Sequence, residues 1–289
     1  MTAKTRTALI PFLFVWLWST GFIGARFGLP YIEPFNFISI RFGIVIVLFA
    51  IMILIAKAAW IPLREIGLQM LVGFLLHGLY LGGVFYAISR GFPAGLSAII
   101  VGVQPILTIT VNRLFFGTVI SHKQAIGVIL GFAGLLAVIL GSAEIDGSDV
   151  GTIGLTACIV ALFGIAASTI IQKRYCADIP LLAGSFWQYV GAFITVLPAT
   201  LLLETHWVEH TWQLYAAIIW AIVALSIVAV LLLMYMIREG EVAKVTSYFY
   251  LVPPAAVIQA WWLFGETLSP VSIFGCLVVM LGVALVVRN

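Results

Sequence analysis

Two polar side chains share one face of the apolar stretch 67–89. His77 and Tyr80 are three positions apart, so a helix places them next to each other. A buried imidazole can hydrogen-bond a ligand or change protonation near neutral pH, and a tyrosine adds an aromatic wall with a polar tip. A packing role for a lone buried histidine stays open. We predict that both residues bind substrate, and that His77 is the best candidate for a proton carrier if protons take part.

A second polar stripe is predicted in the stretch 93–115. Ser97, Gln104 and Thr108 are separated by seven and four residues, which places them on one helix face. Such a stripe points toward other helices, either as the wall of a cavity or through hydrogen bonds between helices. Both interpretations stay open for Gln104, and hydrogen bonding is the simpler one for Ser97. We include Gln104 among the predicted substrate-binding residues.

Two charged side chains lie near the ends of apolar stretches. Arg41 is about one turn inside the stretch 36–56, where it could reach the membrane interface or bind the carboxylate of an anionic or zwitterionic substrate. Glu266 precedes Ser269-Pro270, a helix-start signal, so a solvated turn is its simplest role. We predict that Arg41 binds substrate, with Glu266 as a second charged group of the same outer vestibule.

Aromatic residues could complete the site. The chain has 9 Trp, 9 Tyr and 20 Phe. Those at deep positions could line a pocket for a flat ligand, although packing against lipid explains any single one equally well. We predict that the pocket is lined by Trp16, Trp187 and Tyr248.

Catalytic and metal-binding patterns are absent from the sequence. It contains no HExxH, no Gly-x-Ser-x-Gly and no Walker motif. Its three cysteines, Cys158, Cys176 and Cys276, form no CxxC pair, so neither disulfides nor a metal site are indicated. The net charge of +3 is too small to indicate nucleic-acid binding. We therefore predict no enzyme, no metal, no cofactor and no nucleic-acid partner.

The composition identifies the surroundings of these side chains. Of 289 residues, 63% are hydrophobic and 9% are charged, whereas soluble domains carry about 25% charged residues. No soluble core could enclose this much apolar surface, so we predict a lipid bilayer around an all-α protein. Ten stretches match helices that cross a hydrocarbon core of about 30 Å. They are residues 8–26, 36–56, 67–89, 93–115, 124–141, 152–172, 181–203, 211–237, 243–264 and 270–287.

The two halves of the chain share one register. At an offset of 148 residues, six identities pair Pro105 with Pro253, Phe116 with Phe264, Gly117 with Gly265, Ser121 with Ser269, Gly127 with Gly275 and Gly134 with Gly282. This predicts two copies of one unit, residues 1–143 and 152–289, joined by an acidic linker at 144–151. Pro105 and Pro253 interrupt helical hydrogen bonding near mid-membrane, and we predict that they are gating bends.

Five spans in each copy give the repeats opposite orientations. A unit with an odd number of spans ends on the other side of the membrane, so its tandem copy must be inverted. Inverted repeats are common in secondary transporters, with the substrate site between the halves. With the N-terminus in the cytoplasm, only Arg26, Arg41 and Arg90 of the 14 Lys and Arg residues fall outside. We therefore predict a multi-pass bacterial inner-membrane protein with both termini in the cytoplasm.

Short motifs occur in a fixed order along the chain: Trp18-Ser19-Thr20, Arg41-Phe42, Gln104-Pro105, Pro253 and Gly265-Glu266-Thr267-Leu268-Ser269. Together they resemble the drug/metabolite transporter superfamily, EamA type, over nearly the whole chain. The resemblance implies ten spans in two EamA units, and export or exchange of small metabolites, often amino acids or related compounds. One departure is Thr118, which stands where the second copy has Glu266, so an essential acid in both halves is not implied.

We therefore predict an inner-membrane secondary transporter that exports or exchanges small metabolites by alternating access. Its expected partners are a small-molecule substrate and the lipid bilayer, and it is expected to act as a monomer or homodimer. A passive facilitator or channel for small solutes is the alternative. Channels usually carry a fixed polar pore or a charged ring, and no such pattern is evident in this sequence.

Overall fold

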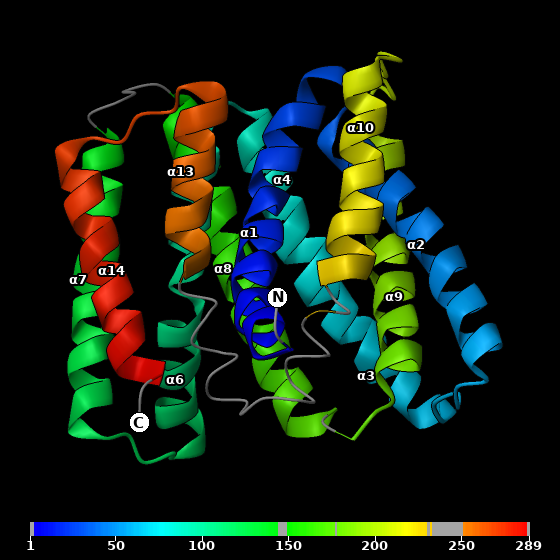
Figure 1. The fold of residues 1–289 in the computed structure, drawn as a ribbon, viewed down its shortest axis with the longest axis horizontal. Coiled ribbons are helices and arrows are strands. Elements are labelled where there is room, and N and C mark those ends of the chain that lie inside the picture. Colours follow the sequence, from blue (N-terminus) through cyan, green and yellow to red (C-terminus); the bar gives the residue numbers. More distant parts are fainter. Residues whose placement is uncertain (1–2, 144–148, 177, 230–231, 233–250, 288–289) are drawn as a thin grey trace.

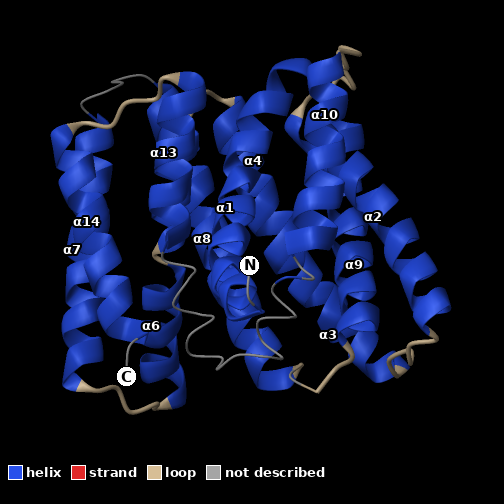
Figure 2. Ribbon diagram, viewed as in Figure 1, coloured by secondary structure: helices blue, strands red, loops and turns tan. Residues whose placement is uncertain are grey.

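The computed structural model describes residues 3–143, 149–176, 178–229, 232 and 251–287, and these ranges contain helices and no strand (Figures 1 and 2). The helices of the first half are α1 (Ala3–Gly28), η1 (Leu29–Tyr31), α2 (Pro34–Ala56), α3 (Leu63–Gly73), η2 (Phe74–Leu81), α4 (Gly82–Ser89), α5 (Ala94–Gly102), α6 (Gln104–Phe116) and α7 (His122–Ala143). Those of the second half are α8 (Asp149–Tyr175), α9 (Leu181–Leu203), α10 (Trp212–Trp220), η3 (Ala221–Ala229), α13 (Val252–Phe264) and α14 (Pro270–Val287).

The length and composition of these helices suit a membrane. Eight helical runs of the described ranges are long and apolar enough to cross one, and two shorter apolar helices, Val252–Phe264 and Pro270–Val286, follow them. The first residues of the expected span 243–264, including Tyr248, lie outside the described residues. The protein is therefore an all-helical, multi-pass membrane protein, and the count of ten spans stays a prediction.

The expected fourth span, residues 93–115, is present as the apolar run Ala94–Phe116, which is divided at Val103 into two helices. α5 ends at Gly102 and α6 begins at Gln104, with Pro105 in its first turn, where the missing N–H of proline leaves no hydrogen bond unmade. α13 begins in the same way, with Pro253 in its first turn. Both helices end at a left-handed glycine, Gly117 with φ 65° and Gly265 with φ 66°. The two helices therefore begin and end at positions 148 residues apart.

Two spans contain π-helical segments that the sequence did not predict. η2 lies between α3 and α4, and η3 continues α10. In η3, the Ser226 hydroxyl donates to the carbonyl oxygen of Ala221, five residues earlier, at 3.2 Å. π-helical turns are rare and often occur at functional sites, because the wider turn changes the direction of neighbouring side chains.

α7 and α14 run antiparallel, side by side at one edge of the molecule (Figure 1). Their contact is made through glycines. A Cβ added at Gly134 would lie 2.8 Å from the Gly275 carbonyl oxygen, and one at Gly282 would lie 2.7 Å from the Gly127 carbonyl oxygen. Small residues allow such close backbone contact in membranes. Gly134 and Gly282 are equivalent in the repeat, and so are Gly127 and Gly275. Each contact is therefore the equivalent of the other, and the helix pair has local two-fold symmetry.

Candidate substrate-binding site

Arg41 lies inside the helix bundle. Its side chain belongs to α2 and the residue is 5% exposed. Nε and Nη2 donate to Ser226 Oγ of η3 at 3.2 and 3.1 Å, and the Tyr189 hydroxyl of α9 donates to the same oxygen at 3.3 Å. Arg41 therefore does not extend to the membrane interface, which was one of the two roles expected for it.

His77 and Tyr80 lie in the same region, on η2. The His77 ring stacks on Tyr189 with centroids 4.3 Å apart, and its edge meets Phe42 at 5.9 Å. Tyr80 packs against the core cluster that contains Phe42 and Tyr189. The Nδ1 atom of His77 is buried and has no hydrogen-bond partner among the described residues. We call Arg41, His77, Tyr80, Tyr189 and Ser226 the Arg41 cluster.

The other predicted residues have different surroundings. Gln104 Nε2 donates to Thr108 Oγ1 of its own helix at 3.0 Å. Trp16 is 47% exposed. Trp187 packs in a separate cluster with Ile53. Within the described ranges, no hydrogen bond or ring contact joins these residues to the Arg41 cluster, and Tyr248 cannot be placed.

Two members of the Arg41 cluster, Ser226 and Tyr189, were not predicted from the sequence. Ser226 is a single hydroxyl in the apolar segment Ala221–Ala229, and the rule that selected Gln104, a polar group within a span, also applies to it. Tyr189 belongs to no motif and is one of 9 tyrosines. Only the packing of α9 against α2 brings it to the site.

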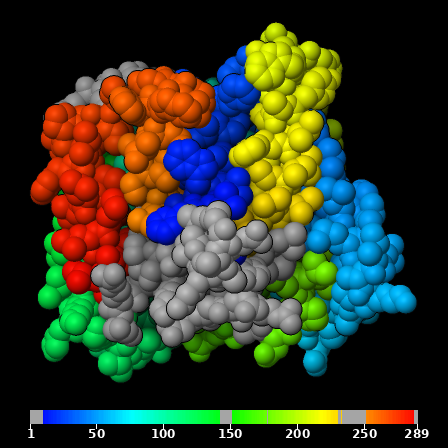
Figure 3. All heavy atoms as spheres, in the orientation of Figure 1, coloured from blue at the N-terminus to red at the C-terminus, as the bar shows by residue number. Residues whose placement is uncertain are grey.

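A groove of about 360 Å³ lies elsewhere, between α1, α10 and α13 on the face drawn in Figure 3. None of the predicted site residues lines it. Its lining is mostly apolar and consists of Thr20, Ile23, Gly24, Phe27, Ala216, Ala217, Trp220, Leu263 and Phe264.

Carboxylates join the two halves at the upper end in Figure 1, which carries the connections 29–33, 204–211 and 265–269. Both oxygens of Glu204 accept from the first turn of α2, at 2.7 Å from the N–H groups of Phe35 and Asn36. In return, Glu33 accepts from the N–H groups of Thr205 and Trp207 at 3.1 Å. The Glu204 contact is favourable because a carboxylate at a helix N-terminus satisfies free N–H groups and the helix dipole, whereas Glu33 satisfies N–H groups of the connection between α9 and α10.

The two carboxyl groups have opposite pKa shifts. Burial raises the pKa of Glu33, but hydrogen bonds from Thr205 and Trp207 outweigh it, so the pKa lies below 4.5. The pKa of Glu204 is raised, first by burial and then by the charge of Glu33, against the hydrogen bonds from Phe35 and Asn36. Ionised Glu33 therefore stabilises the fold above its unfolded pKa, and this contribution is lost as the pH falls through its folded pKa. Ionised Glu204, whose pKa is raised, instead costs some stability.

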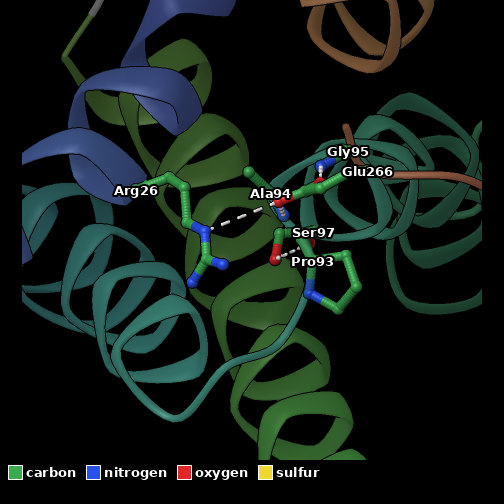
Figure 4. Close-up of polar contacts among 6 residues, drawn as sticks. All are labelled: Arg26, Pro93, Ala94, Gly95, Ser97 and Glu266. Carbon is green, nitrogen blue, oxygen red and sulfur yellow. Dashed lines mark hydrogen bonds and ion pairs between the residues drawn. The ribbon is translucent and has the colours of Figure 1, made fainter. Parts of the chain in front are cut away.

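Glu266 makes a third contact of this kind (Figure 4). Its Oε1 and Oε2 atoms accept from the N–H groups of Ala94 and Gly95, each at 3.1 Å, at the start of α5. Its Oε1 also lies 3.8 Å from Arg26 Nε of α1. Glu266 is therefore a helix cap between the halves and not the solvated turn residue that its position in sequence suggested. We call the contacts of Glu33, Glu204 and Glu266 the upper contacts.

The exchange Glu266→Gln is expected to weaken the cap on α5. An amide has only one acceptor oxygen, so one of the two N–H groups loses its partner, at a cost of about 1–2 kcal/mol. The half-exposed Arg26 adds little. The melting temperature of the purified protein should fall by several degrees. Glu209→Gln, an exposed acid at the same end, is the control and should leave it unchanged; equal effects of both exchanges would contradict the cap.

Comparison with known proteins agrees with this architecture. The EamA-like transporter family matches residues 6–140 and again residues 152–288. The chain is 25% identical to the "Uncharacterized inner membrane transporter YedA" of Escherichia coli K12, covering 93% of this chain and 87% of that one. It is 26% identical to a "Probable amino-acid metabolite efflux pump" of Salmonella typhimurium, covering 96% and 93%.

The crystal structure of another protein has the same fold. It superposes with a TM-score of 0.64 at 18% identity, over 97% of this chain and 96% of that one. At this identity the likeness concerns the fold alone. The resemblance inferred from the short motifs is confirmed by the double family match, which covers nearly the whole sequence. The chain belongs to the EamA-like transporter family and carries two copies of its domain.

Proposed function

We propose that this protein is an inner-membrane secondary transporter that exports or exchanges amino acids or related small metabolites by alternating access. Ten spans form two inverted five-helix repeats, residues 1–143 and 152–289, around the linker 144–151. Both termini lie in the cytoplasm, so the upper end faces the periplasm. The substrate site lies between the repeats, at the Arg41 cluster.

The Arg41 cluster is the observation that carries this proposal. Arg41 and His77 come from the first half and Tyr189 and Ser226 from the second, so both halves build one buried polar site. Polar groups inside a membrane bundle are costly and usually mark a substrate or ion path. Supporting observations are the two-fold glycine contact between α7 and α14 and the name of the Salmonella relative.

The upper contacts supply a reversible closure for such a cycle. Each of them joins one half to the other, and the isolated antiparallel pairing of Ile32 with Val208 lies beside them. The contacts of Glu204 and Glu266 are helix caps, worth about 1 kcal/mol each, and the hydrogen bonds of Glu33 to the connection 204–211 add a similar amount. Together these contacts are worth a few kcal/mol, which is the free-energy difference typical of two interconverting conformations. Opening to the periplasm would break these contacts, and closing would remake them.

Counterflow in proteoliposomes tests the function. Vesicles with purified protein are loaded with an unlabelled amino-acid mixture and diluted into labelled amino acids one at a time. Transient accumulation above that in protein-free vesicles is expected for at least one of them. Failure to exchange any compound of the mixture would overturn the proposal, and single-channel currents in a planar bilayer would favour a passive channel instead.

The first-turn proline of α13 is expected to matter for the rate of the cycle. Pro253→Ala, made together with Pro254→Ala, restores two N–H groups and allows a regular helical turn at this position, so the break that we propose as a gating bend becomes stiffer. Transport in proteoliposomes should slow severalfold at unchanged expression. Pro62→Ala, at the N-cap of α3, is the control. Wild-type transport by the double variant would remove the gating role.

A further inference from the structure

Arg41 is a buried cation without a counter-ion in the part of the chain that the structure describes. The two ion pairs of that part are Arg26 with Glu266 and Arg64 with Glu65, so no carboxylate lies within 4 Å of Arg41. The guanidinium donates to the neutral hydroxyl of Ser226, which also accepts from the neutral hydroxyl of Tyr189. A buried charge costs several kcal/mol unless an opposite charge compensates it. Among the described residues, Arg41 therefore has no charged partner of the kind that its burial calls for.

The site around Arg41 has features of a binding site rather than of packing alone. His77 Nδ1 is a second buried polar atom without a partner among the described residues. His77 and Ser226 both lie on π-helical segments, one from each half. The remaining wall is aromatic, with Phe42 and Phe49 against Tyr189 at centroid distances of 5.5 and 5.7 Å. One cation thus lies beside flat apolar surfaces.

We propose that Arg41 binds the carboxylate of the transported molecule, and that the rings beside it hold an apolar or aromatic remainder. Two parallel N–H groups of a guanidinium match two carboxylate oxygens, and this pairing would replace the shared bond to Ser226. A single cation compensates the one charge of a carboxylate, whereas a phosphate ester carries nearly two at neutral pH. This inference rests on the proposed transport function and specifies which group of the substrate Arg41 binds and which part the rings hold.

Matched carboxylate and amide pairs test the ligand class. Phenylalanine, leucine, methionine and threonine are each titrated against their own amides, and 3-phenylpropanoate against 3-phenylpropanamide, on the purified full-length protein. At least one carboxylate is expected to bind ten times more tightly than its amide, and Arg41→Gln should remove that preference. Equal affinities within every pair, or no binding by any carboxylate of the panel, would overturn the proposal.

A second variant keeps the test decisive if Arg41→Gln fails to fold. Ser226→Asp places a carboxylate within reach of the guanidinium, and Ser226→Asn has nearly the same shape without the charge. The affinity for the preferred carboxylate is expected to be at least tenfold lower in the Asp variant than in the Asn variant, with no lower melting temperature. Equal affinities of the two variants would contradict a role of Arg41 in carboxylate binding.

Counterflow on the same preparations separates this inference from the proposed function. Exchange of the amides as readily as the carboxylates would overturn the carboxylate site and leave the transport function intact. Exchange of no compound in the panel or in the amino-acid mixture would overturn the transport function itself. The expected result is exchange of the carboxylate members alone, lost in the Arg41→Gln and Ser226→Asp variants.

Discussion

Gly282→Ala is expected to lower the free energy of unfolding by about 1–3 kcal/mol, the usual cost of forcing extra volume into a packed interior. The added Cβ would lie 2.6 Å from the backbone nitrogen of Gly131 and 2.7 Å from the carbonyl oxygen of Gly127. Backbone atoms cannot rotate away as a side chain can, so α7 and α14 must separate. The melting temperature of the purified protein measures the effect.

Gly67→Ala is the matched control, since it adds the same methyl group to another membrane helix. A Cβ at Gly67 has no atom of another part within 4 Å. Replacing a glycine inside a helix then gains about 0.5–1 kcal/mol, because the unfolded chain loses freedom. The two exchanges should therefore shift the melting temperature in opposite directions. An unchanged melting temperature for Gly282→Ala would show that the α7–α14 contact is not as close as described.

The repeat and its equivalent glycines could be predicted from the sequence, but the contacts that these glycines make could not. The identities of Gly127 with Gly275 and of Gly134 with Gly282 follow from one register. That Gly127 faces Gly282 and Gly134 faces Gly275 depends on antiparallel packing of two helices far apart in the chain. An internal repeat shows which residues are equivalent, but it does not show which of them are in contact.

The local helix geometry was predicted in part. Pro105 indicated an interruption, and the structure places the break just before it, at Val103. The stripe expected from Ser97 to Thr108 assumed one continuous helix, and the interruption at Val103 lies between Ser97 and the other two residues, so their shared face stays a prediction. The π-helical segments η2 and η3 had no signal, because an apolar stretch with little periodicity is compatible with either helix type.

Individual residues of the candidate site could be predicted from the sequence, but their partners could not. Arg41 and His77 stood out because polar groups are rare in apolar stretches. Their partners are set by tertiary packing: Ser226 is 185 positions from Arg41 and 37 from Tyr189. Glu266 was misjudged for the same reason, since the N–H groups that it caps lie 172 and 171 positions earlier.

A disulfide across the upper contacts is expected to stop transport completely. Ile32 and Val208 face each other in an isolated antiparallel pairing. Directly opposite residues of such a pair have Cα atoms about 4.5–5.5 Å apart, within the range of about 4.4–6.8 Å that a disulfide spans. The variant Ile32→Cys with Val208→Cys should therefore oxidise without distortion. The native cysteines, Cys158, Cys176 and Cys276, are buried and remain as they are.

Two controls separate locking from damage. Each single cysteine variant should transport like the wild type under oxidising and reducing conditions. Reduction of the double variant should restore transport, because the bond alone holds the halves together. A double variant that stays inactive after reduction would point to a damaged fold, which the melting temperature would reveal.

Counterflow by the oxidised double variant tests alternating access most directly. If the two halves must separate at the upper end in every cycle, accumulation of the labelled amino acid should fall to the level of protein-free vesicles and return on reduction. Undiminished counterflow by fully cross-linked protein would contradict the account, because substrate would then pass without any opening between Ile32 and Val208.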